Sequence, residues 1–194
     1  KSENMIYPDE DYAWDNNSVN FIVNNKEDND DVKKSKINYF IRHMGIKNFG
    51  ESTVNLLYDN GFNTLSKLFN MRADEIDGLE RMGKTSALKI CNNIQEGIKN
   101  VKLYKVVAAS TILEEGIAEN RLKDLFEHLE IDGIDKLIEF SKNEDIFNLI
   151  IDVKGFGDII TQKFIKNLPK LIKWLQQHKQ ISISKSKNIA INNE

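Results

Sequence analysis

The chain has 194 residues, 40% of them apolar and only 2 of them proline, which is enough for one well-buried core or two small ones. No apolar run approaches the roughly 20 residues that span a bilayer and no signal peptide is recognisable, which argues against membrane and secretory roles. The single cysteine excludes an internal disulfide. Together with only three histidines, it also leaves too few soft ligands for a structural zinc site. We expect a cytoplasmic protein, bacterial or from a viral replication compartment. Because the chain begins at Lys1, we also expect it to be part of a longer protein.

The formal net charge of −3 is unevenly distributed. Residues 1–31 carry nine acids and two lysines, so the remaining 163 residues have a net charge of +4. The run KEDNDD at 26–31 is typical of a solvated linker. Residues 161–187 contain seven lysines and no acid, which suits this end of the chain to contact polyanions.

The spacing of apolar residues predicts an all-α body behind a small irregular or β N-terminal piece. Residues 5–24, with YAW and SVNFIV, favour strands, whereas from Lys33 onward apolar residues recur at i, i+3 and i+4. Many of the predicted helices are short and need packing on neighbours to be stable. They span residues 35–44, 51–60, 63–70, 73–78, 84–98, 102–112, 119–129, 132–141, 144–151, 158–167 and 169–178.

Four turns recur at near-constant spacing in the helical body. Their closing residues are Gly50, Gly83, Ala118 and Gly157, separated by 33, 35 and 39 residues. Each turn has a small or turn-tolerant opening residue, an apolar residue, the closing residue and then a predicted helix. This pattern matches tandem helix-hairpin-helix repeats, whose glycines permit positive φ and close approach of the backbone.

The turns are candidate phosphate-binding sites. A helix start has unpaired N–H groups and partial positive charge, and glycine lets a phosphate oxygen approach without meeting a Cβ. Because these donors are backbone groups, binding should be indifferent to base sequence. The candidate DNA-binding residues are Asn48, Phe49, Gly50, Glu51, Arg81, Met82, Gly83, Lys84, Thr85, Gly116, Ile117, Lys154, Gly155, Phe156, Gly157 and Lys163.

Residues 37–178 resemble the four-repeat helix-hairpin-helix domain of NAD-dependent DNA ligases. The segments IKNFGESTVNLL, LERMGKTSALKICNNI, LEEGIAENRLKDLFEHL and VKGFGDIITQKFIKNL are similar to its four hairpins in order. The resemblance implies a module that grips nicked double-stranded DNA across the minor groove during replication and repair. It also implies a catalytic domain or subunit as partner, and NAD as cofactor of the complete enzyme, with no cofactor in this chain.

The sequence departs from the family pattern near its N-terminus. In that family a four-cysteine zinc module precedes the repeats, but YPDEDYAW at 7–14 has no cysteine, so zinc is not predicted. We therefore divide the chain into a degenerate zinc-module-like segment with an acidic linker at 1–32, the repeat domain at 33–180, and a tail or linker to a further domain at 181–194.

The four turns also differ from one another. Ala118 and Glu115 place a methyl group and a negative charge near any phosphate at the third turn, so we expect that turn to be structural. Asn48 and Arg81 replace the opening glycine in the first and second turns; asparagine tolerates the left-handed region better than arginine, and arginine can itself contact a phosphate. The fourth turn, GFG, fits the pattern best.

No catalytic residue is predicted. The adenylated lysine of the ligase family lies in KxDG, and the nearest strings here, EIDG at 75–78 and 130–133, carry Glu75 and Glu130 at the lysine position. Cys91 fits a helical apolar pattern and a core position. The histidines His43 and His128 fit helix ends, and Trp14 and Trp174 fit core anchors better than base-stacking platforms.

Two hypotheses remain open. The first is the DNA-gripping module of a ligase, which the turn glycines and Lys47, Lys84, Lys154 and Lys163 favour. The second is a non-catalytic helix-hairpin-helix scaffold for protein–protein contacts in a DNA repair or replication complex, which the net charge of −3 mildly favours.

Overall fold

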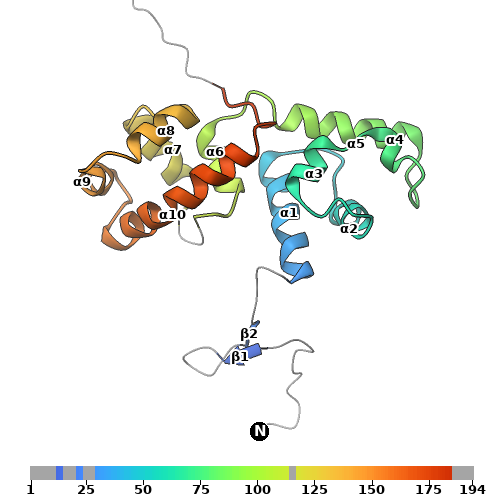
Figure 1. Ribbon diagram of the computed structural model, residues 1–194, viewed down its shortest axis with the longest axis horizontal. Helices are drawn as coiled ribbons and strands as arrows, with labels where there is room; N and C mark the ends of the chain where they lie inside the picture. Colours follow the sequence, from blue (N-terminus) through green and yellow to red (C-terminus); the bar gives the residue numbers. More distant parts are fainter. Residues whose placement is uncertain (1–11, 15–20, 24–28, 114–116, 185–194) are drawn as a thin grey trace, which may run out of the picture.

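The computed structural model describes residues 12–14, 21–23, 29–113 and 117–184 (Figure 1). Strands β1 (Tyr12–Trp14) and β2 (Phe21–Val23) pair antiparallel within the segment predicted to favour strands. The rest of the described chain is helical, which confirms the all-α body. Its helices are α1 (Asp30–Met44), α2 (Glu51–Asp59), α3 (Leu65–Asn70), α4 (Ala73–Ile76), α5 (Lys84–Gly97), α6 (Leu103–Ala109), α7 (Glu119–His128), α8 (Ile134–Phe140), α9 (Ile146–Ile151) and α10 (Asp158–Gln177).

Helix α1 begins inside the acidic run that the sequence suggested was a linker. The side chain of Asn29 caps it by accepting a hydrogen bond from the Val32 N–H at 2.9 Å. Asp30 and Asp31 occupy the first turn, where the partial positive charge of the helix start stabilises acids. The linker interpretation is therefore wrong for residues 30 and 31, because these acids complete a helix terminus.

The same acidic helix start ties α1 to α2. The Tyr58 hydroxyl donates a 2.7 Å hydrogen bond to Asp30 Oδ1, and Lys34 Nζ lies 2.8 Å from Asp59 Oδ1. Burial of the tyrosine, together with the Asp30 carboxylate, raises the pKa of Tyr58 to about 12. Tyr58 thus remains a hydrogen-bond donor throughout the physiological pH range.

Helix α10 replaces two predicted helices. The segments 158–167 and 169–178 form one continuous helix with Pro169 inside it. Proline has no N–H and its ring crowds the carbonyl four residues earlier, so it normally kinks or ends a helix. Leu168 and Leu171 are buried on either side of it, so the apolar face of α10 continues past the proline into the core.

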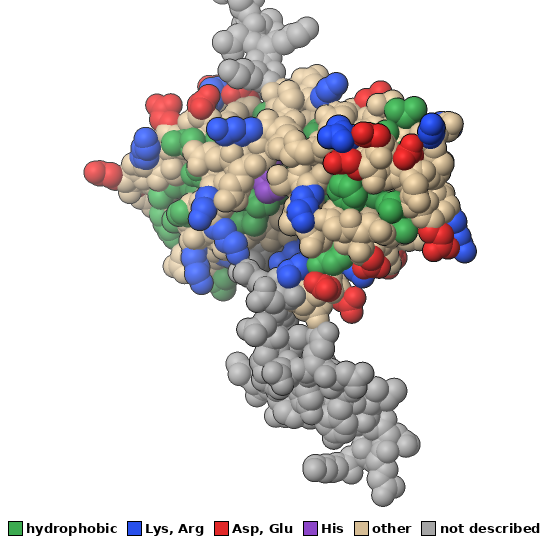
Figure 2. Space-filling view, turned by 45° about the vertical axis from the view of Figure 1, so that its right-hand side comes forward, with side chains coloured by type: hydrophobic (Ala, Val, Ile, Leu, Met, Phe, Trp, Pro, Cys, Tyr) green, Lys and Arg blue, Asp and Glu red, His purple; other side chains and the backbone are tan. Residues whose placement is uncertain are grey.

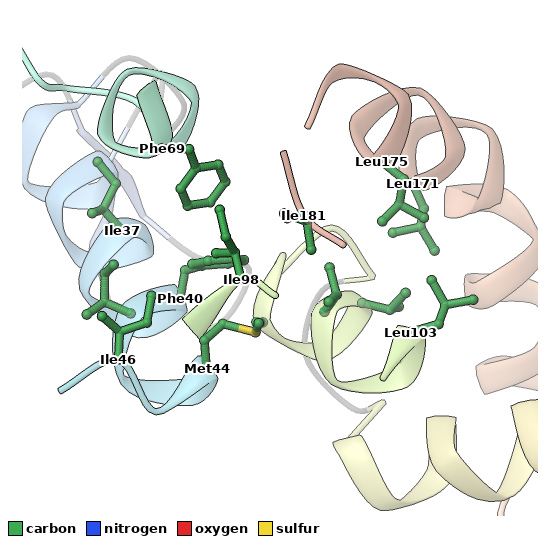
Figure 3. Close-up of a cluster of buried hydrophobic side chains, with 14 of the residues drawn as sticks. Ile37, Phe40, Met44, Ile46, Phe69, Ile98, Leu103, Leu171, Leu175 and Ile181 are labelled. Atoms are coloured by element: carbon green, nitrogen blue, oxygen red, sulfur yellow. The ribbon is translucent and has the colours of Figure 1, made fainter. Parts of the chain in front are cut away.

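The helices form two groups that share one core. Figure 1 places α1–α5 on one side and α6–α10 on the other. Phe40 of α1 is completely buried where they meet, with its ring centroid 5.6 Å from that of Phe69 in α3 and 6.2 Å from that of Trp174 in α10. Figure 3 shows Ile181 between the Phe40 side of this core and the Leu175 side.

The first residues of the predicted tail pack on the body. The Val101 N–H donates to the Ser182 carbonyl at 2.9 Å, and the Ser184 N–H donates to the Val101 carbonyl at 2.8 Å. Ile181 is buried. Residues 181–184 therefore pack on the segment that joins α5 to α6. None of the described helices is both long and apolar enough to span a bilayer.

Gly97 lets the chain between α1 and α2 lie directly on α5. A Cβ built at Gly97 would be only 2.5 Å from Ile46 Cγ1, closer than a Cβ lies to a non-bonded carbon in proteins. Beside this contact, the Asn93 side-chain amide donates to the Lys47 carbonyl at 2.9 Å. The position of this turn therefore depends on a glycine some 50 residues away in the sequence.

We predict that Gly97→Ala destabilises the protein although alanine is the better helix former. The gain in helix propensity is about 1 kcal/mol, whereas overpacking a buried contact typically costs about 1–3 kcal/mol. Chemical denaturation should show a net decrease in the free energy of unfolding on the order of 1 kcal/mol. In an Ile46→Ala background the same substitution should be neutral or stabilising. A gain in stability in the original sequence would contradict the close packing.

Candidate nucleic-acid interface

The four predicted turns each join two helices and end at the start of the second. The first turn (45–50) joins α1 to α2, the second (77–83) joins α4 to α5, and the fourth (152–157) joins α9 to α10. The third (110–118) lies between α6 and α7 and includes residues 114–116, which fall outside the described part. The second helices start where the sequence predicted, at residues 51, 84, 119 and 158.

The closing residues share one backbone conformation, and it is not left-handed. Their φ angles are −86° at Gly50, −86° at Gly83, −70° at Ala118 and −94° at Gly157, with ψ between 158° and 176°. The closing glycines therefore do not use the positive φ that glycine permits, because an N-cap residue takes extended backbone before the helix begins.

The fold itself does not require glycine at the closing positions. A Cβ built at Gly50, Gly83 or Gly157 meets no heavy atom within 4 Å, and Ala118 already carries one in the same conformation. Three turns nevertheless have glycine there, and all four closing residues are exposed. Their common property is a backbone open to approach from outside.

Positive φ occurs instead two residues earlier, at the opening positions. The angle is 57° at Asn48, 59° at Arg81 and 93° at Gly155. Gly116, the corresponding candidate in the third turn, lies outside the described residues. The substitutions of glycine by Asn48 and Arg81 thus place side chains in a conformation that costs non-glycine residues about 1–2 kcal/mol.

The apolar residue of each turn is buried beneath the helix that follows. Phe49, Met82, Ile117 and Phe156 are between 3% and 7% exposed. The Phe156 ring meets the Phe164 ring of α10 edge-on, with centroids 6.3 Å apart. Although these four were grouped with the candidate DNA-binding residues, their side chains face the core, and their role in the turn is to position the exposed backbone.

The four helix starts have similar geometry but different charge. The N-cap residues of α2, α5, α7 and α10 make no side-chain hydrogen bond to the first turn of their helices. Glu51, Glu119 and Asp158 add an acid to the first turn of three of these helices, whereas α5 begins with exposed Lys84 and Thr85 and has no acid there. The first turn of α5 therefore has the most favourable charge for an anion among the four helix starts, which the glycine pattern alone did not indicate.

The turns lie in pairs. Ser52, Thr53 and Leu56 of α2 line a depression of about 240 Å³ together with residues 80–82 of the second turn. In the other half, a Cβ at Gly155 would lie 3.4 Å from Nε of Arg121 in α7, so the fourth turn contacts the helix that follows the third.

Arg121 is a basic residue at the turns that the sequence search missed. It follows its closing residue by three positions, as Thr53 does, so the repeat spacing already placed it beside a turn. Of the predicted lysines, Lys47, Lys84 and Lys154 are exposed next to their turns, and Lys163 is partly buried in α10.

The residues set aside as non-catalytic have structural environments. The Glu75 carboxylate accepts a 2.8 Å hydrogen bond from the Arg72 N–H at the start of α4, and Glu130 follows the end of α7. Cys91 packs half-buried against the core, and burial raises the pKa of its thiol, which disfavours the reactive thiolate. His43 Nε2 lies 2.7 Å from Glu119 Oε2 and links α1 to α7.

Most of the chain is similar in sequence to part of several DNA ligases. The DNA ligase of Acanthamoeba polyphaga mimivirus is 27% identical over 170 residues, which cover 86% of this chain and 26% of the ligase. The DNA ligase of Flavobacterium psychrophilum is 29% identical over 168 residues, which cover 82% of this chain and 24% of the ligase. The DNA ligase of Treponema denticola is 25% identical over 134 residues, which cover 69% of this chain and 19% of the ligase. No family model matches the chain. The chain is thus related to a DNA ligase region and spans about a quarter or less of these relatives.

We predict that Arg81→Gly stabilises the fold. Glycine removes the cost of positive φ, partly offset by its greater freedom in the unfolded chain, which leaves a gain of about 0.5–1 kcal/mol. Little is lost in return, since the Arg81 side chain is 90% exposed and its ion pair with Glu80 is at the surface. Thermal and chemical denaturation measure the gain. Arg81→Ala keeps the positive φ and serves as the control; equal stability of the alanine and glycine variants would contradict the prediction.

Proposed function

We propose that this chain, which is related to a region of DNA ligases, is the DNA-binding module of an NAD-dependent enzyme of that class. It holds nicked double-stranded DNA while a catalytic domain or subunit outside this chain seals the nick. The complete enzyme uses NAD, and this chain binds the DNA and positions the nick. The similarity to ligases of a virus and of bacteria supports the class of enzyme.

The observation that carries the proposal is the exposed glycine at three helix starts. Neither backbone conformation nor internal packing requires glycine at Gly50, Gly83 or Gly157. A phosphate oxygen that must reach the N–H groups of the next helix does require it, because a Cβ would stand in its path. The buried apolar residue beside each glycine keeps this backbone in place before DNA arrives.

This mode of binding should be indifferent to sequence and sensitive to salt. Backbone N–H groups and lysines contact phosphates and cannot distinguish bases. The paired turns suit a duplex better than a single phosphate, because neighbouring turns can hold phosphates of the same DNA. The net charge of −3 is no obstacle, since residues 1–31 carry nine acids against two lysines and the remaining 163 residues have a net charge of +4.

We predict that Gly157→Val weakens binding to a nicked duplex far more than Ala118→Val. Valine at 157 places a branched side chain where the phosphate approaches, whereas position 118 already has a Cβ. We expect a loss of about tenfold at 157, equivalent to roughly 1.4 kcal/mol, and at most a few-fold loss at 118. Fluorescence anisotropy with labelled nicked DNA measures both affinities.

Both variants should fold, so a difference in their DNA affinity reports on binding and not on stability. Position 157 has an extended backbone that valine favours, and a Cβ there meets nothing. Melting curves followed by circular dichroism provide the control. Equal losses at the two positions would show that the turns are ranked wrongly. No loss at either would favour the alternative of a scaffold for protein–protein contacts.

We also predict a steep salt dependence. If about six phosphates are neutralised, affinity should fall on the order of 10³-fold between 50 and 200 mM salt through loss of counterion release. Anisotropy titrations of unrelated duplexes at both concentrations test this, and the affinities should be similar at each. Binding that does not respond to salt would argue against phosphate contacts.

A further inference from the structure

A groove between the two helix groups contains no residue of the first, second or fourth turn and is bordered by residues 110–112 at the start of the third. It has a volume of about 330 Å³ and is lined by α1, α3, α10 and the end of α6. Its lining residues are Lys36, Ile37, Leu65, Ala109, Ser110, Thr111, Ile112, Lys170 and Trp174. Lys170 lies 13 residues beyond Gly157 on one helix, which corresponds to about 20 Å along its axis. A phosphate at the fourth turn cannot also occupy this groove.

The charged side chains among the described residues that line the groove are both lysines. Lys36 and Lys170 belong to different walls, α1 and α10. On α10, Lys166 and Lys173 stand four residues before and three after Lys170, which places all three on one helix face. Figure 2 shows Lys and Arg side chains gathered towards the middle of one face, with acidic side chains mostly nearer its edges.

An aromatic ring completes the groove. Trp174 is partly exposed and is held firmly, with its ring stacked on that of His178 at a centroid distance of 4.2 Å and tilted against buried Phe40. His178 Nδ1 lies 2.8 Å from the Trp174 carbonyl oxygen, and burial lowers the pKa of this histidine, which favours its neutral ring. The indole is therefore packed against two rings of the core and lines the groove together with two lysines.

We infer that this groove binds a single strand of nucleic acid, with phosphates on Lys36 and Lys170 and a base against Trp174. A positively charged channel combined with an aromatic surface is the arrangement that binds single strands without sequence preference, because every phosphate is anionic and every base has a π face. A duplex keeps its bases stacked inside and can offer this groove only phosphates. The inference is independent of the proposed binding of duplex DNA at the turns.

Trp174 fluorescence tests the groove directly. The chain has 2 tryptophans, so Trp14→Phe leaves Trp174 as the only reporter. A ten-nucleotide oligothymidylate, titrated at 50 mM salt, should quench its emission saturably, because a base stacks beside the indole. Lys36→Glu with Lys170→Glu in this background should weaken the apparent affinity at least tenfold. The matched charge change, Lys99→Glu with Lys142→Glu at exposed positions elsewhere, should alter it no more than twofold.

Three outcomes would overturn the inference. Binding of the oligonucleotide by anisotropy without quenching would place the strand elsewhere, and equal quenching by a blunt duplex of the same length would mean that the groove contacts only phosphates. Loss of quenching in Gly157→Val would place the strand at the turns. Retained quenching in that variant, together with weakened duplex binding, supports both sites; retained quenching with no duplex binding in any variant supports the groove and contradicts the proposed function.

Discussion

The burial of one apolar side chain in each turn is the contact on which the rest of the arrangement depends. Phe49, Met82, Ile117 and Phe156 each follow the opening residue and insert into the core, which leaves the next residue at the surface as the N-cap of a helix. Burial of the apolar residue thus leaves the closing residue that follows it exposed at the surface. In each of the four turns the N-cap residue makes no side-chain hydrogen bond to the helix start, and the proposed anion binding depends on this arrangement.

Opening and closing positions of the turns carry different constraints. The opening residue must adopt positive φ, which is an internal requirement of the chain reversal, yet two of the four turns meet it with Asn48 and Arg81. The closing residue adopts ordinary extended backbone and is glycine in three turns. Glycine is thus replaced at two opening positions, where positive φ favours it, and present at three closing positions, where neither the backbone conformation nor the packing requires it. This distribution supports the proposed external partner at the closing positions.

The contact between the two helix groups contributes more than stability. Phe40 and Trp174 join α1 to α10, and residues 181–184 bridge the segment between α5 and α6. Because Trp174 uses one face against His178 and contacts Phe40, it is both part of the core and part of the groove. The interpretation of this tryptophan as a core anchor is thus compatible with a second role at the surface, and sequence alone does not separate the two.

The sequence by itself determined the helical class, the four turns and the starts of the helices that follow them. These features have local causes: apolar periodicity, a residue suited to the N-cap, and a buried residue next to it. Tertiary structure decided what depends on contacts distant in sequence. Helix α10 continues past Pro169, beside which Leu168 and Leu171 are buried. The absence of a Cβ at Gly97 leaves room for Ile46, and Arg121 of the third repeat contacts the turn of the fourth. The groove of Lys36, Lys170 and Trp174 likewise exists only because α1 and α10, more than a hundred residues apart, pack around one core.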